Sequence, residues 1–109
     1  MSIDLPGPVA AYFNATNARD VETMLASFDD NARVKDEGQE HHGRLAIRSW
    51  IVDAVRKYRF TVEVKDVSDA DGETIVSGLV SGDFPGSPAV LRHAFRLSDG
   101  KISDLEIDA

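Results

Sequence analysis

Apolar residues in the first half of the chain recur at intervals of three and four, the spacing of an amphipathic helix. One such segment starts near Pro6 and Pro8, whose missing N–H groups would be unpaired in a first helical turn anyway. A second follows Asp20, a residue suited to capping a helix, and carries a stripe of Val21, Met24, Leu25 and Phe28. The polar run Asp29-Asp30-Asn31 is expected to end it. A third helix is predicted from about Arg44 to Tyr58.

Alternation with a period of two indicates strands in the rest of the chain. A short strand is predicted over Ala32–Asp36, followed by a polar loop from Glu37 to Gly43 that holds His41 and His42. Further strands, bounded by turn residues, are predicted over Phe60 to about Asp66, Glu73–Asp83, Ala89–Ser98 and Lys101–Ile107. Three helices followed by an antiparallel meander predict an α+β fold class. The length of 109 residues predicts a single domain over residues 1–109.

The balance of charge narrows the range of partners. Twelve Lys and Arg against nineteen Asp and Glu leave a net charge of −7, which disfavours nucleic acid and anionic membrane surfaces. The sequence contains no cysteine, which excludes disulfides and thiolate metal sites. The opening Met1-Ser-Ile-Asp4 lacks the basic residues of a signal peptide, and no apolar run is long enough to span a membrane. These features predict a soluble cytoplasmic protein.

The sequence carries no motif for a cofactor. It contains neither a glycine-rich phosphate-binding loop nor a serine nucleophile elbow. His41 and His42 are adjacent, so their side chains diverge, and no second set of ligands accompanies them at metal-binding spacing. A solvated loop is favoured over a metal site there. We expect no cofactor and no metal.

Three polar residues fall on the inward faces of the predicted elements. Alternation places His93 on the same face as Leu91 and Phe95, and it turns Asp36 inward at the end of its strand. Tyr12 lies on the apolar side of the first helix. Each has an ordinary alternative: a solvated strand-end carboxylate, a core histidine bonded to a carbonyl, or a core tyrosine with its hydroxyl at the edge. Together, on three separate elements, they favour a pocket.

Aromatic residues on the same inward faces would line such a pocket. Trp50 is most simply part of the core on the third helix, with a pocket wall as its second interpretation. We expect the ligand-binding residues to be Trp50, Phe13, Phe28 and Phe95.

Four stretches carry a family resemblance: Tyr12–Asp20, Phe28–Asp36, Gly43–Trp50 and His93–Ile102. In these stretches the chain resembles the nuclear transport factor 2-like superfamily, in particular its SnoaL-like and ketosteroid isomerase-like bacterial members. The resemblance spans about Pro8 to Ile107. It implies a cone-shaped, strongly curved antiparallel or mixed sheet wrapped around three N-terminal helices, with a pocket between them. It also implies a homodimer, and it leaves the function open because one fold hosts many chemistries.

The resemblance to ketosteroid isomerases also implies roles for the three inward residues. Tyr12 matches the tyrosine that donates to the substrate oxygen, and Asp36 matches the aspartate that shuttles the proton. His93 stands where those enzymes have a second, protonated aspartate, so the chain departs from the pattern there.

Three functions are compatible with these observations. The first is an isomerase, cyclase or dehydratase acting on a small apolar carbonyl compound, with Asp36 as the base and with Tyr12 and His93 polarising the oxygen. The second is a module that binds a small hydrophobic ligand without turning it over. The third is a dimeric adaptor that uses the outer face of the sheet.

Overall fold

The computed structural model describes residues 4–109, so Met1 to Ile3, part of the segment considered for a signal peptide, lie outside the described residues. The described residues form three helices and six strands. In chain order these are α1 (Gly7–Ala18), α2 (Val21–Ala26), β1 (Phe28–Asp36), β2 (Gln39–His42), α3 (Arg44–Tyr58), β3 (Thr61–Ala70), β4 (Glu73–Ser81), β5 (Ala89–Ser98) and β6 (Lys101–Asp108). Within residues 4–109, no helix is both long and apolar enough to cross a membrane.

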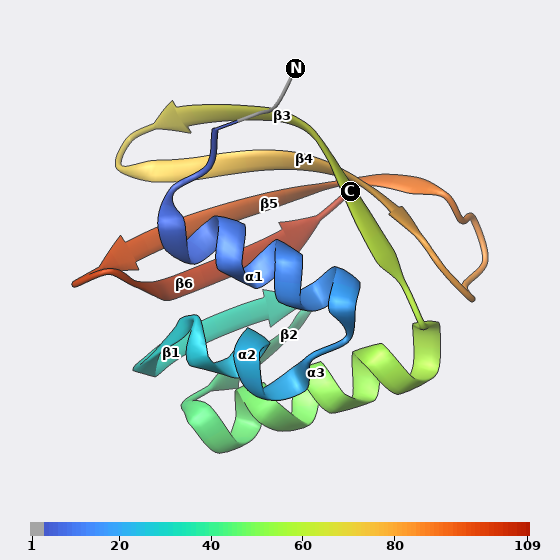
Figure 1. Cartoon of the computed structure of the whole chain (residues 1–109), viewed down its shortest axis with the longest axis horizontal. Coiled ribbons are helices and arrows are strands. Elements are labelled where there is room, and N and C mark those ends of the chain that lie inside the picture. Colours follow the sequence, from blue (N-terminus) through green and yellow to red (C-terminus); the bar gives the residue numbers. More distant parts are fainter. Residues whose placement is uncertain (1–3) are drawn as a thin grey trace.

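All six strands belong to one mixed sheet, in the order β2-β1-β6-β5-β4-β3. Strands β1 and β6 are parallel, and the other neighbouring pairs are antiparallel. Figure 1 shows β3 to β6 curving over α1, while α3 lies alongside β1 and β2. The predicted α+β class, with a curved mixed sheet around three helices, is confirmed.

The core lies between the concave face of the sheet and the helices. Its largest fully buried side chains come from both layers, and include Met24, Phe28, Ile47, Ile51 and Phe95. Each contributes roughly 1.5–3 kcal/mol to folding by leaving water. Their burial holds α1 and α3 against the inner face of the sheet.

The start of β1 differs from the sequence prediction. Helix α2 begins at the Asp20 cap as expected, where Thr23 donates its N–H to the Asp20 side chain at 3.2 Å, but it ends at Ala26. Phe28 opens β1 instead of closing the helix, and the run Asp29-Asp30-Asn31 continues the strand. The reason is backbone pairing with a strand that is distant in the sequence. Ile102 donates its N–H to the Ser27 carbonyl at 2.9 Å, which draws this segment against β6.

The predicted polar loop from Glu37 to Gly43 is also wrong, because it contains strand β2. Glu37 and Gly38, with φ of 54° and 77°, form the two-residue turn of a hairpin in which Asp36 pairs with Gln39. Strand β2 lies at the edge of the sheet and is polar throughout, so it shows no alternation that a sequence pattern would reveal.

The remaining boundaries agree closely with prediction. Helix α3 and strand β5 have the predicted bounds. Strand β3 runs on to Ala70, β4 stops at Ser81, and β6 reaches Asp108.

Candidate functional site

A cavity of about 610 Å³, here called the inner cavity, opens between the concave face of the sheet and the helices. Helices α1 and α3 form its walls, and Phe84 and Pro85 of the β4–β5 loop lie at its rim. Most of its lining is aliphatic or aromatic. The three inward polar residues of the sequence prediction, Tyr12, Asp36 and His93, all line it.

The predicted aromatic lining is divided between the inner cavity and the core. Phe13 and Trp50 line the cavity. Phe28 and Phe95 do not border it, and pack instead with their ring centroids 5.6 and 5.9 Å from that of Tyr12. Periodicity identified the inward faces, but it does not say how deep the cavity reaches along them.

Asp36 closes β1 with its side chain turned toward the helices. The indole N–H of Trp50, on α3, donates to its Oδ2 at 3.0 Å. Burial raises the pKa of Asp36 above its ordinary value, and the Trp50 hydrogen bond partly opposes the rise because it favours the carboxylate. One carboxylate oxygen is thus held in place, beside an apolar cavity, in a group with an increased affinity for a proton.

Tyr12 reaches the same cavity from α1. It is buried, with 3% of its surface exposed. Burial, and then the negative charge of Asp36, raise the pKa of the Tyr12 hydroxyl well above its usual value. The hydroxyl therefore stays protonated and available as a hydrogen-bond donor.

His93 lies across the sheet from Asp36. Both residues pair with Ile107 of β6, Asp36 from β1 and His93 from β5. Two strand spacings place their backbones about 10 Å apart. Burial lowers the pKa of His93 to about 4, against smaller opposing effects of the Val76 and Leu91 backbone and of the Asp108 charge. The ring is therefore neutral at pH 7, and a base and a neutral imidazole stand at two separate places in the cavity.

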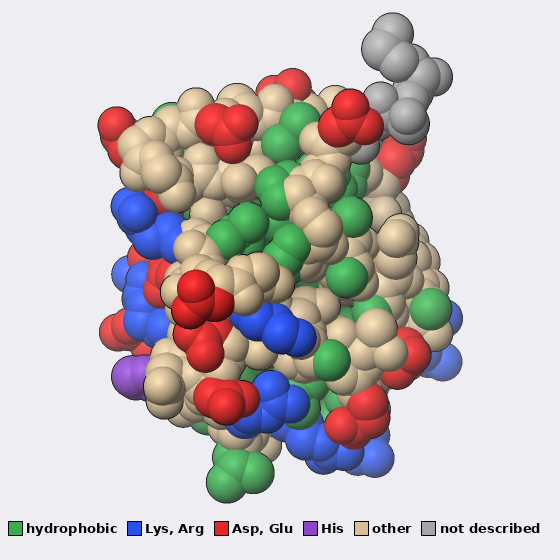
Figure 2. Space-filling view, turned by 60° about the vertical axis from the view of Figure 1, so that its left-hand side comes forward, with side chains coloured by type: hydrophobic (Ala, Val, Ile, Leu, Met, Phe, Trp, Pro, Cys, Tyr) green, Lys and Arg blue, Asp and Glu red, His purple; other side chains and the backbone are tan. Residues whose placement is uncertain are grey.

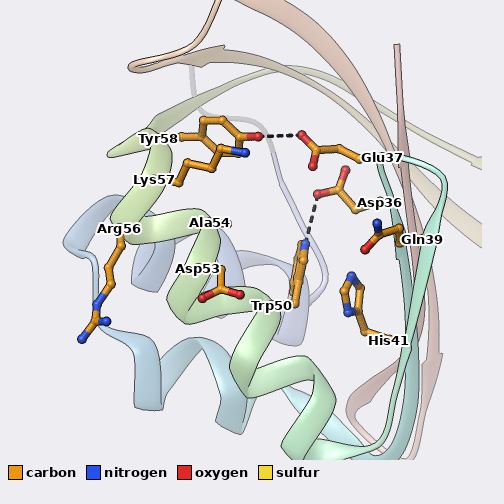
Figure 3. A pocket seen from close by; sticks show the side chains of 10 residues that line it. All are labelled: Asp36, Glu37, Gln39, His41, Trp50, Asp53, Ala54, Arg56, Lys57 and Tyr58. Carbon is orange, nitrogen blue, oxygen red and sulfur yellow. Dashed lines mark hydrogen bonds between the residues drawn. The ribbon is translucent and has the colours of Figure 1, made fainter.

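A second hollow of about 480 Å³, the outer hollow, lies between α3 and the β1–β2 hairpin. Asp36 and Trp50 line both hollows, and so do Glu37 and Tyr58. Figure 3 shows two hydrogen bonds crossing from α3 to the hairpin: Trp50 to Asp36, and Tyr58 to Glu37 at 2.9 Å. His41 lies beside the Trp50 indole, with ring centroids 6.1 Å apart.

Sequence reasoning did not find the Glu37–Tyr58 contact. The sequence predicts that Tyr58 ends the third helix, but it assigns Glu37 to a polar loop. The contact depends on the hairpin turn at Glu37, which forms only because the polar strand β2 pairs with β1. Among residues 4–109, no group of three or more His, Asp and Glu side chains gathers as a metal site would require.

The fold and the cavity define an α+β protein whose curved mixed sheet and helices surround an open inner cavity. The model of the SnoaL-like domain matches residues 9–105, and the chain belongs to this family, within the nuclear transport factor 2-like superfamily. No curated protein matches the chain.

Several solved structures are similar. A candidate polyketide cyclase from Sinorhizobium meliloti is 37% identical over 99% of both chains, with a TM-score of 0.94. A Catenulispora acidiphila protein with a ketosteroid isomerase-like fold, solved with trimethylamine, is 16% identical over 97% of this chain and 87% of that chain (TM-score 0.83). A third structure is that of SalBIII, an epoxide hydrolase/cyclase-like enzyme with a role in pyran ring formation in the polyether salinomycin. It is 23% identical over 92% of this chain and 85% of that chain, with a TM-score of 0.80. The last two structures show that their proteins share the fold of this chain.

Proposed function

We propose that the protein catalyses proton transfer on a small apolar carbonyl compound, as an isomerase, cyclase or dehydratase, with Asp36 as the general base. The observation that carries the proposal is the position of Asp36 at the wall of an apolar cavity, with Oδ2 held by Trp50 at 3.0 Å. Burial raises its pKa, so it removes a proton more readily than a surface aspartate would.

The other residues of the cavity suit the same step. Asp36 takes a proton from the carbon next to the carbonyl, and the electron pair moves onto the carbonyl oxygen. The protonated Tyr12 hydroxyl donates a hydrogen bond to that oxygen as its negative charge develops. Return of the proton to another carbon completes an isomerisation. In a cyclisation, the enolate carbon instead attacks a second carbonyl carbon of the same molecule, the π pair of that carbonyl moves onto its oxygen, and the resulting alkoxide takes the proton from Asp36.

The relatives support this reaction class. The structure that is 37% identical over nearly the full length is a candidate polyketide cyclase. SalBIII, which shares the fold, is an epoxide hydrolase/cyclase-like enzyme of ring formation. Ring formation and proton transfer both use an acid or base positioned beside the substrate.

The adaptor interpretation has less support. An adaptor needs a broad apolar surface, but on the outer face of the sheet Arg33 forms ion pairs at 2.7 Å with Glu40, Asp104 and Glu106. Figure 2 shows the end of the molecule with the β3–β4 and β5–β6 turns, where charged side chains of both signs surround and interrupt the hydrophobic ones. In the described chain, the exposed large hydrophobic residues lie apart, Leu45 on α3 and Val90 and Leu97 on β5.

Deuterium exchange tests the proposed function with simple ketones in place of the natural substrate. Apolar enolisable ketones, beginning with 1-tetralone and 1-indanone, would be incubated in D₂O with the protein, and exchange at the carbon next to the carbonyl would be followed by NMR. We expect the wild-type protein to accelerate exchange, and Asp36→Asn to remove the acceleration, by at least about 100-fold. Asp53→Asn is the matched control, because Asp53 lines only the outer hollow. Binding of the ketones without exchange would instead identify a non-catalytic binding module.

A further inference from the structure

The two adjacent histidines of β2 turn to opposite faces of the sheet. His41 lies opposite Val34 of β1, and His42 lies opposite Arg33. Residues directly opposite each other on antiparallel strands turn their side chains to the same face. Val34 is buried in the core, so His41 turns toward the helices and is half-buried, whereas His42 turns outward and is exposed. Of the two, it is His41 that lines the outer hollow.

His41 and Asp36 are diagonal neighbours on this inward face. Asp36 pairs with Gln39, and His41 follows two residues further along β2. The Cα atoms of such a pair lie about 7–8 Å apart, a separation that the two side chains and one water molecule can bridge. Both residues contact the same indole: Trp50 donates to Oδ2 of Asp36 at 3.0 Å, and its ring centroid lies 6.1 Å from that of His41, at an interplanar angle of 31° (Figure 3). The charge of a protonated His41 favours the Asp36 carboxylate, as expected at this separation.

Asp36 stands between two hollows of different character. The inner cavity is lined mostly by aliphatic and aromatic side chains, whereas the outer hollow is lined mainly by polar and charged ones. Besides Asp36 and His41, the charged side chains of the outer hollow are Glu37, Asp53, Arg56 and Lys57. Two of them are engaged with Tyr58, whose hydroxyl donates to Glu37 at 2.9 Å and whose ring centroid lies 5.1 Å from Nζ of Lys57. Arg56 extends away from the hairpin (Figure 3). His41, by contrast, shares with Asp36 both a sheet face and contact with the indole.

We propose that His41 relays the proton of Asp36 to and from solvent, through a water molecule in the outer hollow. When the C–H bond of the substrate breaks in the inner cavity, its proton forms the O–H bond of the Asp36 carboxylic acid. The acid then passes this proton through the water to a nitrogen of the neutral His41 ring, which restores the carboxylate. The imidazolium releases the proton to bulk water at the mouth of the hollow. The relay rests on the proposed function of Asp36 as the base, and it brings protons to Asp36 from the side opposite the substrate.

Deuterium exchange of 1-tetralone in D₂O tests the relay. We expect His41→Ala to slow the exchange about tenfold, because the proton then returns to the ketone before it reaches solvent, and to bind the ketone within about twofold of the wild type by calorimetry. His42→Ala, the adjacent histidine on the opposite face, is the matched control and should exchange like the wild type. Millimolar imidazole should restore exchange in His41→Ala, whereas pyrazole, which has the same shape and is a far weaker base, should not. Restoration by both compounds, or by neither, would overturn the relay in favour of a packing role.

Carbon NMR of the Asp36 carboxyl provides a readout that needs no turnover. In the wild type and in His42→Ala, its ¹³C resonance should show an inflection that follows the titration of the His41 ring resonances, and His41→Ala should lack it. An Asp36 resonance that does not respond to His41 overturns the relay. If His41→Ala exchanges as fast as the wild type while Asp36→Asn abolishes exchange, the relay fails alone and the proposed base stands. A wild-type protein that does not accelerate exchange contradicts the base and the relay together.

Discussion

The indole N–H of Trp50 donates to Oδ2 of Asp36 across 3.0 Å, and this bond joins α3 to the end of β1 between the inner cavity and the outer hollow. It holds one oxygen of the Asp36 carboxylate against α3. It also opposes the effect of burial on the pKa of Asp36. Trp50 therefore holds the proposed base in place and also moderates the rise in pKa that burial causes.

Trp50→Phe is expected to raise the pKa of Asp36 further, since it removes a hydrogen bond to the charged form and keeps an aromatic ring in the wall. The acidic limb of the pH profile for deuterium exchange should move to higher pH, and ¹³C NMR of the Asp36 carboxyl should titrate at higher pH. Tyr58→Phe is the control, because it removes the neighbouring bond to Glu37 and leaves the Asp36 contact intact. Equal shifts of the Asp36 pKa in Trp50→Phe and Tyr58→Phe would contradict the assigned role of the Trp50 hydrogen bond.

Asp36→Asn is expected to maintain or raise the Tm at pH 7. The folded-state pKa of Asp36 lies above its unfolded value, so the wild-type protein loses stability as pH rises from the unfolded pKa through the folded one. The amide avoids that cost, and its oxygen can still accept from Trp50. Calorimetric scans at pH 4 and pH 7 measure the difference, which should grow with pH. If Asp36 instead were a solvated carboxylate that caps the end of the strand, Asp36→Asn would lower the free energy of unfolding by about 1 kcal/mol.

His93 is expected to make the protein less stable in acid. Its folded pKa of about 4 lies below the ordinary value of 6.5, so between these values the unfolded chain binds a proton that the folded chain does not. The contribution of His93 to the free energy of unfolding is present in full above pH 6.5. It decreases as the pH falls toward 4, by up to about 3 kcal/mol. Urea unfolding of wild type and His93→Phe at pH 7 and pH 4.5 measures it. The variant should show the smaller loss, and identical losses would exclude a buried neutral ring.

Gly78→Ala is expected to destabilise the protein by about 1–3 kcal/mol, because a methyl group there would lie 2.7 Å from Cγ1 of Val62. The strain should also displace the His93 ring, and its NMR resonances would report the movement. Gly7→Ala provides the comparison: Gly7 begins α1, and beyond its chain neighbours and the backbone of its own helix, no atom of the described residues lies within 4 Å of a Cβ built there. That substitution should leave the free energy of unfolding unchanged or slightly raised.

We propose a homodimer formed through the outer face of β4 and β5. Parity turns Val76 into the core and Leu79 outward, where Leu79 pairs with Val90, whose surface is 58% exposed. A second copy would cover this apolar pair in a two-fold contact. Sedimentation of the wild-type chain should give about twice 11.9 kDa at micromolar concentration. Val90→Glu should give the monomer mass and Leu45→Glu, on α3, should not; a monomeric wild type would contradict the dimer.

Local pattern was sufficient for much of this fold. Fifteen residues of helical periodicity defined α3, and the β5 alternation placed His93 on the buried face. The same rule turned Asp36 inward, because in a strand the side-chain direction follows from parity once the strand is recognised. These features can be predicted from residues close in sequence. The apolar face of a helix or strand is the one that packs into the core.

Tertiary structure decided the rest. The segment Asp29-Asp30-Asn31 continues β1 through an irregularity between the Phe28–Ile102 and Arg33–Asp104 pairs with β6, and Gln39–His42 is a strand because β1 supplies its backbone partners. No local pattern reveals either pairing. The parallel β1–β6 pair brings together residues about 70 positions apart, and with the antiparallel β5–β6 pair it sets Ile107 between Asp36 and His93. The sequence determined which polar side chains turn inward. The distance between them, the Trp50 hydrogen bond and the missing partner of His93 Nδ1 within residues 4–109 follow from long-range backbone pairing and packing, whose partners are chosen by the whole chain.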